Sequence, residues 1–215
     1  MVKHSKITKV FQLSLVIIFI LVLLGLFVPQ QFQNISFYLK NLLTTSVGWF
    51  YLLLVTGILI FCVFLIVSPI GQIRLGNPTS RPEHSTTSWI AMMFSAGMGI
   101  GLVFYGAAEP LSHFAISTPN AEIGSADALA DAFRFTFFHW GFHAWAVYAL
   151  VGLSLAYFGF RKREKYQLSV VFKPLFGKYA DGPIATIIDT ITIIATVIGV
   201  ATTLGFGASQ INGGL

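Results

Sequence analysis

The chain alternates between long apolar segments and short polar ones. Five apolar segments are long enough to cross the hydrocarbon core of a membrane, which is about 30 Å thick and takes about 20 residues of helix. They cover approximately residues 10–28, 48–70, 88–108, 135–160 and 183–207. This pattern predicts an all-α integral membrane protein with about five transmembrane helices.

The composition agrees with a membrane protein. Of the 215 residues, 55% are hydrophobic and only 10% are charged, whereas soluble domains carry about 25% charged residues. The basic residues lie in short segments between the apolar runs, which argues against a nucleic-acid-binding face. Cys62 is the only cysteine, so the sequence offers neither a disulfide framework nor a C-x-x-C metal or redox motif.

The basic residues are divided unequally between the two sides of the membrane. Of the 13 lysines and arginines, all except Lys40 and Arg134 fall on one side when the five segments are threaded in turn. Cytoplasmic loops are enriched in lysine and arginine, so the pattern predicts a multi-pass protein of the cell membrane with a cytoplasmic N-terminus. The loop before the fourth segment lies on the opposite side and fits the outer face, because its only basic residue is Arg134 at its end, whereas it carries four acids: Glu109, Glu122, Asp127 and Asp131.

Two local signals concern the ends of segments. Ser125 precedes the acids of "SADALADAFRF" and is an expected N-cap of a helix that leads into the fourth segment. The chain stops at "GASQINGGL" directly after an apolar segment, with an odd number of spans. We interpret it as the N-terminal part of a longer protein, through natural truncation or an incomplete sequence.

The stretch "FSAGMGIG" at residues 94–101 places three glycines at alternate positions within the third segment. Each glycine costs a helix interior about 1 kcal/mol relative to alanine. One interpretation is close helix packing, since Gly97 and Gly101 form G-x-x-x-G. The other is a helix broken within the membrane, whose unwound backbone binds a cation or an anionic group, as in transporters. A nucleotide-binding loop is excluded, because the spacing is not G-x-G-x-x-G and no strand precedes it.

The fourth segment contains the aromatic stretch "FFHWGFHAWAVY". On a continuous helix, Tyr148 lies roughly 80° and Trp145 roughly 140° from Trp140, so the three share one face. They form either an interfacial belt or a cage that binds a quaternary ammonium group through cation–π attraction.

Two further residue sets could carry chemistry. His139 and His143 are four residues apart, a spacing that can present two imidazoles to a metal. We favour packing or a polar contact to a neighbouring helix, because no third ligand is evident. Asp189 is an acid inside the fifth segment, where a functional role is the general expectation. Its place near the cytoplasmic end favours a structural role.

Three segments together carry a family resemblance. "FSAGMGIGLVFYGAAEPLSHF", "FHWGFHAWAVYALVGLSLAYF" and "VIGVATTLGFGASQINGGL" resemble the betaine/carnitine/choline transporter (BCCT) family. The resemblance implies a protein of about twelve helices with two outer helices and two inverted five-helix repeats, a LeuT-like fold, and a homotrimer when complete. Residues 1–87 would then be the cytoplasmic N-terminus and the two outer helices, and residues 88–215 the first three helices of the first repeat.

The resemblance also implies positions for the site. The backbone carbonyls of Ser95 and Met98 would help to hold a sodium ion. Thr196 matches a threonine of a second sodium site, although Val200 stands where some members have another threonine, which argues against that site. The residues that would line the substrate site are Ala96, Met98, Gly99, Ile100 and Gly101, with Trp140, Trp145 and Tyr148 as an aromatic box on the path to it.

From the resemblance we expect secondary active transport of a quaternary ammonium compatible solute for osmoprotection, coupled to sodium and without another cofactor. Glycine betaine is expected rather than choline, because no acid lies between Trp89 and Ala108 to neutralise a net cation. Choline or carnitine transport and a non-transporting truncated membrane fragment are the alternatives. A membrane metalloenzyme built on the two histidines is a third alternative. The scarcity of further acids and histidines inside the spans argues against it, so we do not expect an enzyme.

Overall fold

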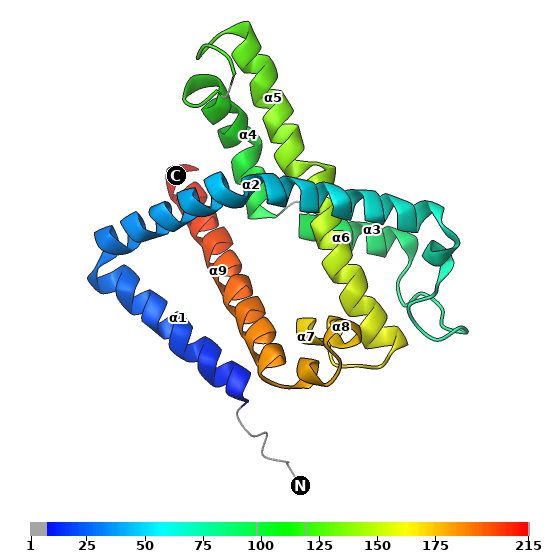
Figure 1. The fold of residues 1–215 in the computed structure, drawn as a ribbon. Coiled ribbons are helices and arrows are strands. Elements are labelled where there is room, and N and C mark those ends of the chain that lie inside the picture. The colour runs from blue at the N-terminus through cyan, green and yellow to red at the C-terminus, as the bar shows by residue number, and fades with distance from the viewer. Residues whose placement is uncertain (1–7, 98, 119, 215) are drawn as a thin grey trace. The chain divides into compact units, whose positions relative to one another are not determined.

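The computed structural model describes residues 8–97, 99–118 and 120–214. Within these residues every regular element is a helix (Figure 1), which confirms the all-α class. The chain divides into two compact units. One contains the residues up to Leu54 and Val151–Ile198, and the other contains Val55–Leu150 and the residues from Gly199 onward. These units are groups of residues that pack together. The expected boundary at residue 88 instead separates the outer helices from the first repeat of a longer protein, and it stays a prediction.

The first two helices follow each other almost directly. Helix α1 (Lys9–Phe27) begins after Thr8, whose hydroxyl accepts a hydrogen bond from the Phe11 N–H at 3.2 Å. Helix α2 (Pro29–Val67) has 39 residues and begins with a proline, which suits a first helical position because the N–H it lacks would have no intrahelical acceptor. Residues 29–47 lie between the first two expected membrane-spanning segments, yet they are helical and continuous with the second. After its first residue this interval has neither glycine nor proline, so nothing interrupts the helix.

The third apolar segment is divided into two helices, α3 (Thr86–Gly97) and α4 (Ile100–Ala115). A short helix, η1 (Pro69–Gln72), and a loop precede them. Helix α4 extends past the expected end of the segment and contains Glu109, which the apolar pattern assigns to an outer loop. Pro110 does not end α4.

The fourth segment also contains a break. Ser125 is the N-cap of α5 (Ala126–Trp140), as predicted, and its hydroxyl accepts a hydrogen bond from the Ala128 N–H at 3.1 Å. Helix α6 (Phe142–Ala156) starts after Gly141. A Cβ atom at Gly141 would lie 2.3 Å from the Phe137 carbonyl oxygen. Only glycine therefore permits this close approach at the junction. The packing of α4 along α5 brings their side chains together.

After α6, a π-helical turn, η2 (Tyr157–Arg161), leads into three short helices: α7 (Leu168–Val171), α8 (Lys173–Phe176) and η3 (Gly177–Asp181). The Lys173 ammonium lies 3.1 Å from the Glu164 carboxylate and 3.3 Å from that of Asp181. Hydrogen bonds to these two carboxylates raise the pKa of Lys173 above its usual value. The ion pairs connect the charged loop after η2 with α8 and η3.

The long helix α9 (Pro183–Gly214) contains the buried acid Asp189. One of its carboxylate oxygens accepts a hydrogen bond from the Ser169 N–H at 3.0 Å, and the other accepts one from the Ser169 hydroxyl at 2.8 Å. Both residues are less than 10% exposed. Asp189 thus connects α9 to the start of α7, which supports the structural role favoured from the sequence.

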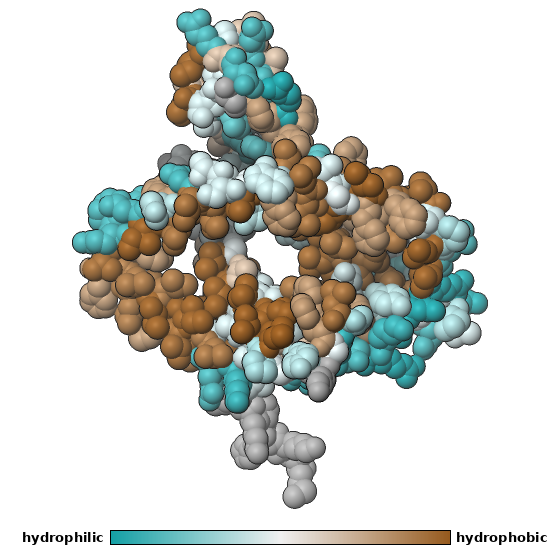
Figure 2. All heavy atoms as spheres, in the orientation of Figure 1, coloured by the Kyte–Doolittle hydropathy of each residue, from teal (hydrophilic) through white to brown (hydrophobic). Residues whose placement is uncertain are grey.

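Four described stretches are long and apolar enough to cross a membrane, judged by length and composition: Lys9–Phe27, Pro29–Val67, Ala126–Arg161 and Pro183–Gly214. The sequence predicts five, and the third is absent from this set because the break divides it. Large apolar side chains are exposed along the helices, including Ile66 at 80% and Phe27 at 78%. Figure 2 shows apolar residues in brown along the helices and polar residues in teal towards helix ends and loops. Lipid tails are the environment in which such exposure is favourable.

Candidate functional site

The glycine-rich segment contains the junction between α3 and α4, so the interruption predicted by one of the two interpretations is confirmed. Gly99 is the N-cap of α4, and its carbonyl accepts hydrogen bonds from the N–H groups of Leu102 and Val103 at 3.1 and 3.3 Å. Its backbone is extended, with φ −69° and ψ 177°. The break therefore does not depend on a left-handed residue at Gly99.

The junction offers both backbone carbonyl groups and backbone N–H groups to a ligand. The last carbonyls of a helix and the first N–H groups of the next lack intrahelical partners, and a helix N-terminus carries a partial positive charge. Ser95 lies exposed in the last turn of α3. A Cβ atom at Gly99 would meet no atom within 4 Å, so the space beside the start of α4 is open. Met98 and the side chains of Ala96, Ile100 and Gly101 lie outside the described residues.

Two of the three predicted aromatic residues form a pair on α6. The ring centroids of Trp145 and Tyr148 are 5.8 Å apart, with an angle of 43° between the ring planes. Both rings are accessible, with 42% of Trp145 and 75% of Tyr148 exposed. Exposed aromatic faces of this kind can bind a quaternary ammonium group.

Trp140 belongs to a different aromatic cluster. Its ring lies 5.7 Å from that of Tyr105 on α4, and Tyr105 contacts Phe206 of α9 at 5.2 Å. Trp140 is connected to the α6 pair through its backbone, since the Trp145 indole N–H donates to the Trp140 carbonyl at 3.1 Å. The prediction that three rings share one face assumes a continuous helix, and the break at Gly141 changes the helical phase between Trp140 and the other two.

Thr196, the residue expected at a second sodium site, lies on α9. Its hydroxyl donates to the Thr192 carbonyl at 2.8 Å, which leaves the lone pairs of the hydroxyl oxygen for another partner. Thr196 and Ser95 belong to different compact units. A joint role for them in binding sodium stays a prediction.

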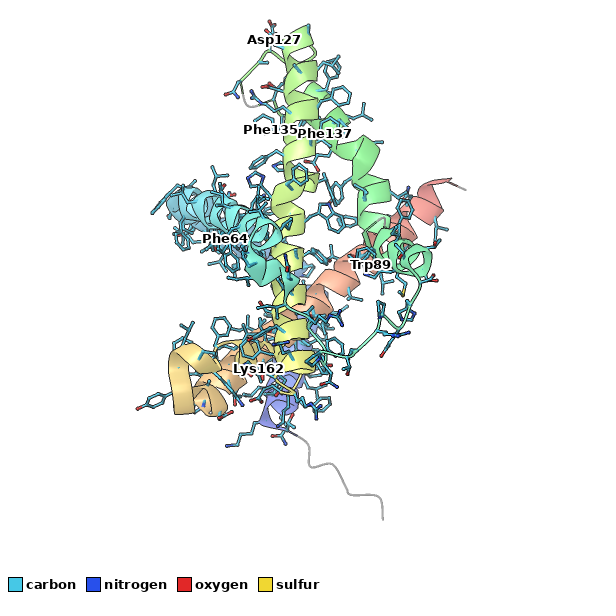
Figure 3. The ribbon with its side chains drawn as sticks, turned by 90° about the vertical axis from the view of Figure 1, so that its right-hand side faces the viewer. Phe64, Trp89, Asp127, Phe135, Phe137 and Lys162 are labelled. Atoms are coloured by element: carbon cyan, nitrogen blue, oxygen red, sulfur yellow. The ribbon has the colours of Figure 1, made fainter. Side chains whose placement is uncertain are left out.

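An acid and two histidines meet where α4 packs on α5. One carboxylate oxygen of Glu109, Oε1, forms an ion pair with His139 Nδ1 and lies 3.5 Å from His113 Nε2. The other, Oε2, accepts a hydrogen bond from the Trp140 indole N–H at 2.6 Å. The ring of Phe135, labelled on α5 in Figure 3, lies 5.7 Å from the His113 ring and 6.3 Å from the His139 ring. We call Glu109, His113 and His139 the Glu–His cluster.

The sequence does not predict this cluster, because the four-residue spacing pairs His139 with His143. His143 has other partners: its Nε2 atom lies 3.4 Å from the Thr56 hydroxyl of α2, and its ring lies 4.6 Å from that of Phe138. This is the polar contact to a neighbouring helix that the sequence favours. The local signal for the cluster was the i, i+4 spacing of Glu109 and His113, which places both on one helix face.

Comparison with known proteins gives relatives that match almost the whole chain. This chain is 53% identical over 215 residues to the glycine betaine transporter OpuD of Bacillus subtilis (strain 168). The match covers 100% of this chain and 42% of the relative. It is 44% identical over 207 residues to a glycine betaine transporter of Acinetobacter baylyi, covering 96% of this chain and 31% of the relative. An ectoine/hydroxyectoine transporter of Virgibacillus pantothenticus is also 44% identical over 207 residues, with 96% and 41% covered.

The chain therefore spans less than half the length of these relatives. Residues 9–215 match the sequence profile described as BCCT, betaine/carnitine/choline family transporter. The match begins with the first residue of α1 and includes both the α3–α4 junction and the aromatic residues of α5 and α6. The chain belongs to the betaine/carnitine/choline transporter family, a family of multi-pass membrane transporters rather than enzymes.

Proposed function

We propose that this chain is part of a secondary transporter that carries a quaternary ammonium compatible solute, glycine betaine, across the cell membrane for osmoprotection. The observation that carries the proposal is the break between α3 and α4 in a chain 53% identical to a glycine betaine transporter. In transporters, broken helices of this kind place unpaired backbone groups at the substrate and ion sites.

The chemistry of the junction favours a zwitterion. The carboxylate of glycine betaine can accept hydrogen bonds from the free N–H groups at the start of α4, where the helix dipole favours negative charge. Its trimethylammonium group suits aromatic faces such as those of Trp145 and Tyr148. Choline has the same cationic group without the carboxylate, so it would use only half of these interactions. Carnitine, which also has a carboxylate, is the alternative within the same site.

Glu109 does not change this preference. It lies nine residues after the start of α4, about 14 Å along the helix axis. Its carboxylate already interacts with His139 and Trp140. Glu109 is the one acid of α4, and it is both distant from the junction and partnered, so this helix supplies no counter-ion for a net cation there.

We further propose sodium as the coupling ion, because α3 ends next to Ser95 and presents free carbonyl groups there. The test replaces sodium by potassium at constant osmolarity during uptake. Loss of glycine betaine accumulation supports sodium coupling, and unchanged accumulation contradicts it. The same cells should grow better at high osmolarity when glycine betaine is supplied.

The substrate test uses two variants at one position in a chimera that joins this chain to the remainder of the Bacillus subtilis relative. Gly99→Asp and Gly99→Asn both place a good N-cap at the start of α4, where a Cβ atom meets no neighbour within 4 Å. They differ in one negative charge. Gly99→Asp should reduce glycine betaine uptake and improve choline relative to it, whereas Gly99→Asn should retain the original preference.

The outcomes separate the alternatives. A chimera that takes up choline in preference to glycine betaine would contradict the proposed substrate. Equal selectivity of the two Gly99 variants would place the substrate away from the junction. Uptake by the chimera but not by the 215-residue chain alone would identify the chain as a non-transporting fragment, and light scattering of the purified chimera tests the proposed homotrimer.

A further inference from the structure

The Glu–His cluster has the composition and geometry of a metal site. We propose that Glu109, His113 and His139 bind a divalent transition-metal cation, with zinc as the representative ion, and that the ion bridges α4 and α5. The three potential ligand atoms, one from each residue, all lie within 4.8 Å of one another. The cluster shares no ligand residue with the proposed substrate site, although Trp140 of the expected aromatic box donates a hydrogen bond to Glu109. The existence of the metal site does not depend on the transported solute.

The distances are close to those that an ion requires. Zinc binds histidine nitrogen and carboxylate oxygen at about 2.1 Å in tetrahedral geometry, so two ligand atoms of one ion are about 3.4 Å apart. His113 Nε2 and Glu109 Oε1 are 3.5 Å apart. The contact between Glu109 Oε1 and His139 Nδ1 is closer, and rotation of the His139 side chain would open it to admit the ion. Two imidazoles and a carboxylate form a ligand set typical of zinc with an open fourth position.

The hydrogen bonds around the cluster already hold two of its ligands in a binding orientation. His113 Nδ1 lies 3.3 Å from the Ser117 carbonyl oxygen. A carbonyl oxygen only accepts, so Nδ1 carries the hydrogen and Nε2 is left to face Glu109. The Trp140 indole N–H holds Glu109 Oε2 and directs Oε1 towards the histidines. Metal-binding histidines and carboxylates are commonly oriented by such outer hydrogen bonds.

Burial distinguishes the cluster from ordinary surface charges. The side chains of Glu109 and His113 are 14% and 19% exposed, whereas that of His139 is 49% exposed. The ring of Phe135 covers one side of the two imidazoles. An ion could therefore approach past His139 and meet two ligands that are mostly shielded from water.

A protonated His139 in a simple ion pair with Glu109 is the competing explanation. It accounts for the contact between those two residues. For His113 it requires a second charged imidazole beside the same carboxylate, because Nδ1 already donates to Ser117 and only an added proton on Nε2 could meet the Glu109 oxygen. A cation between these atoms satisfies all three residues together. The two explanations therefore differ in the part played by His113.

The test measures zinc binding to the purified 215-residue chain in detergent, by calorimetry and by competition with a chromogenic chelator, using an affinity tag without histidine. We expect one ion per chain. Glu109→Gln, His113→Asn and His139→Asn should each weaken binding at least about tenfold, because loss of an outer partner alone costs about 10- to 100-fold. Trp140→Phe removes only an outer hydrogen-bond partner, so it should weaken zinc binding by about 10- to 100-fold and by less than the loss of a ligand. His143→Asn is the matched control, since this histidine contacts Thr56 instead.

A spectroscopic measurement keeps the test valid if a ligand variant fails to fold. Cobalt(II) bound to the unaltered chain should give the visible absorption of a tetrahedral nitrogen–oxygen site, and His139→Cys should add a sulfur-to-cobalt charge-transfer band. Binding that is equally weak in the unaltered chain and the three ligand variants would overturn the proposal. So would an equal loss of affinity in His143→Asn, or a His113→Asn variant that binds zinc as well as the unaltered chain.

Discussion

Replacement of Asp189 by alanine tests how α9 is connected to α7. The carboxylate accepts hydrogen bonds from the Ser169 N–H and hydroxyl at 3.0 and 2.8 Å, in a site where both residues are less than 10% exposed. A hydrogen bond to a charged group contributes about 1.5–3 kcal/mol, and an unsatisfied buried donor costs about 1–3 kcal/mol. Since the two donors belong to one residue and water can enter the space left by the carboxylate, we expect a loss of about 2–4 kcal/mol.

The measurement is thermal unfolding of the purified chain in detergent, followed by circular dichroism. For a protein of this size, each kcal/mol lowers the Tm by roughly 2–4 °C, so Asp189→Ala should lower the Tm by roughly 4–16 °C. Asp189→Asn keeps one acceptor oxygen for the Ser169 N–H and should lose about half as much. A double-mutant cycle with Ser169→Ala isolates the hydroxyl hydrogen bond, for which we expect a coupling energy of about 1–2 kcal/mol.

Three results would refute this account. A Tm unchanged in Asp189→Ala would mean that the carboxylate does not stabilise the connection. Additive effects of Asp189→Ala and Ser169→Ala would mean that the two side chains do not interact. If Asp189→Asn instead abolished glycine betaine uptake by the chimera at an unchanged Tm, the role of Asp189 would be in transport and not in structure.

Three further predictions concern other parts of the chain. Gly141→Ala should destabilise the α5–α6 junction by at least about 1 kcal/mol, because the added Cβ would lie 2.3 Å from the Phe137 carbonyl oxygen. The control is Gly152→Ala, whose Cβ meets nothing within 4 Å, and an equal Tm of the two variants would contradict the prediction. The raised pKa of Lys173 means that its ion pairs stabilise the chain below pH 10.5, so the Tm difference from Lys173→Met should persist around neutral pH and disappear as the pH rises through the raised pKa. A pH-independent difference would assign the effect to packing. With Cys62 replaced by serine, Glu122→Cys should react with an impermeant maleimide from outside intact cells, and reaction only after permeabilisation would reverse the proposed orientation.

The sequence predicts the features that depend on local chemistry. The Ser125 N-cap follows from its hydroxyl and the acids after it. The break before α4, at Gly99, follows from alternate glycines that make a continuous helix unfavourable. Long apolar runs identify the spans because lipid imposes a length on them. In each case the deciding interactions lie within a few residues of one another.

Features that depend on packing between helices could not be predicted in this way. Glu109 and His139 are 30 residues apart, and their contact exists only because α4 packs along α5. The aromatic face that includes Trp140 assumes a continuous helix, whereas α5 ends at Trp140 and α6 begins after Gly141. A glycine directly after Trp140 was the available signal for that interruption, although a single glycine in an apolar run is weak evidence for one.

The length of α2 relates the fold to the thickness of the bilayer. Its 39 residues extend about 58 Å, nearly twice the hydrocarbon thickness of about 30 Å. To fit entirely within the hydrocarbon it would need a tilt of about 60°, beyond the range of about 0–40° observed for membrane helices. Part of α2 therefore extends into the headgroup region, and the polar side chains near its start identify that part: Gln30, Gln31, Gln33 and Asn34. A thicker bilayer would draw more of this end into lipid, so the position of α2 should respond to hydrophobic mismatch.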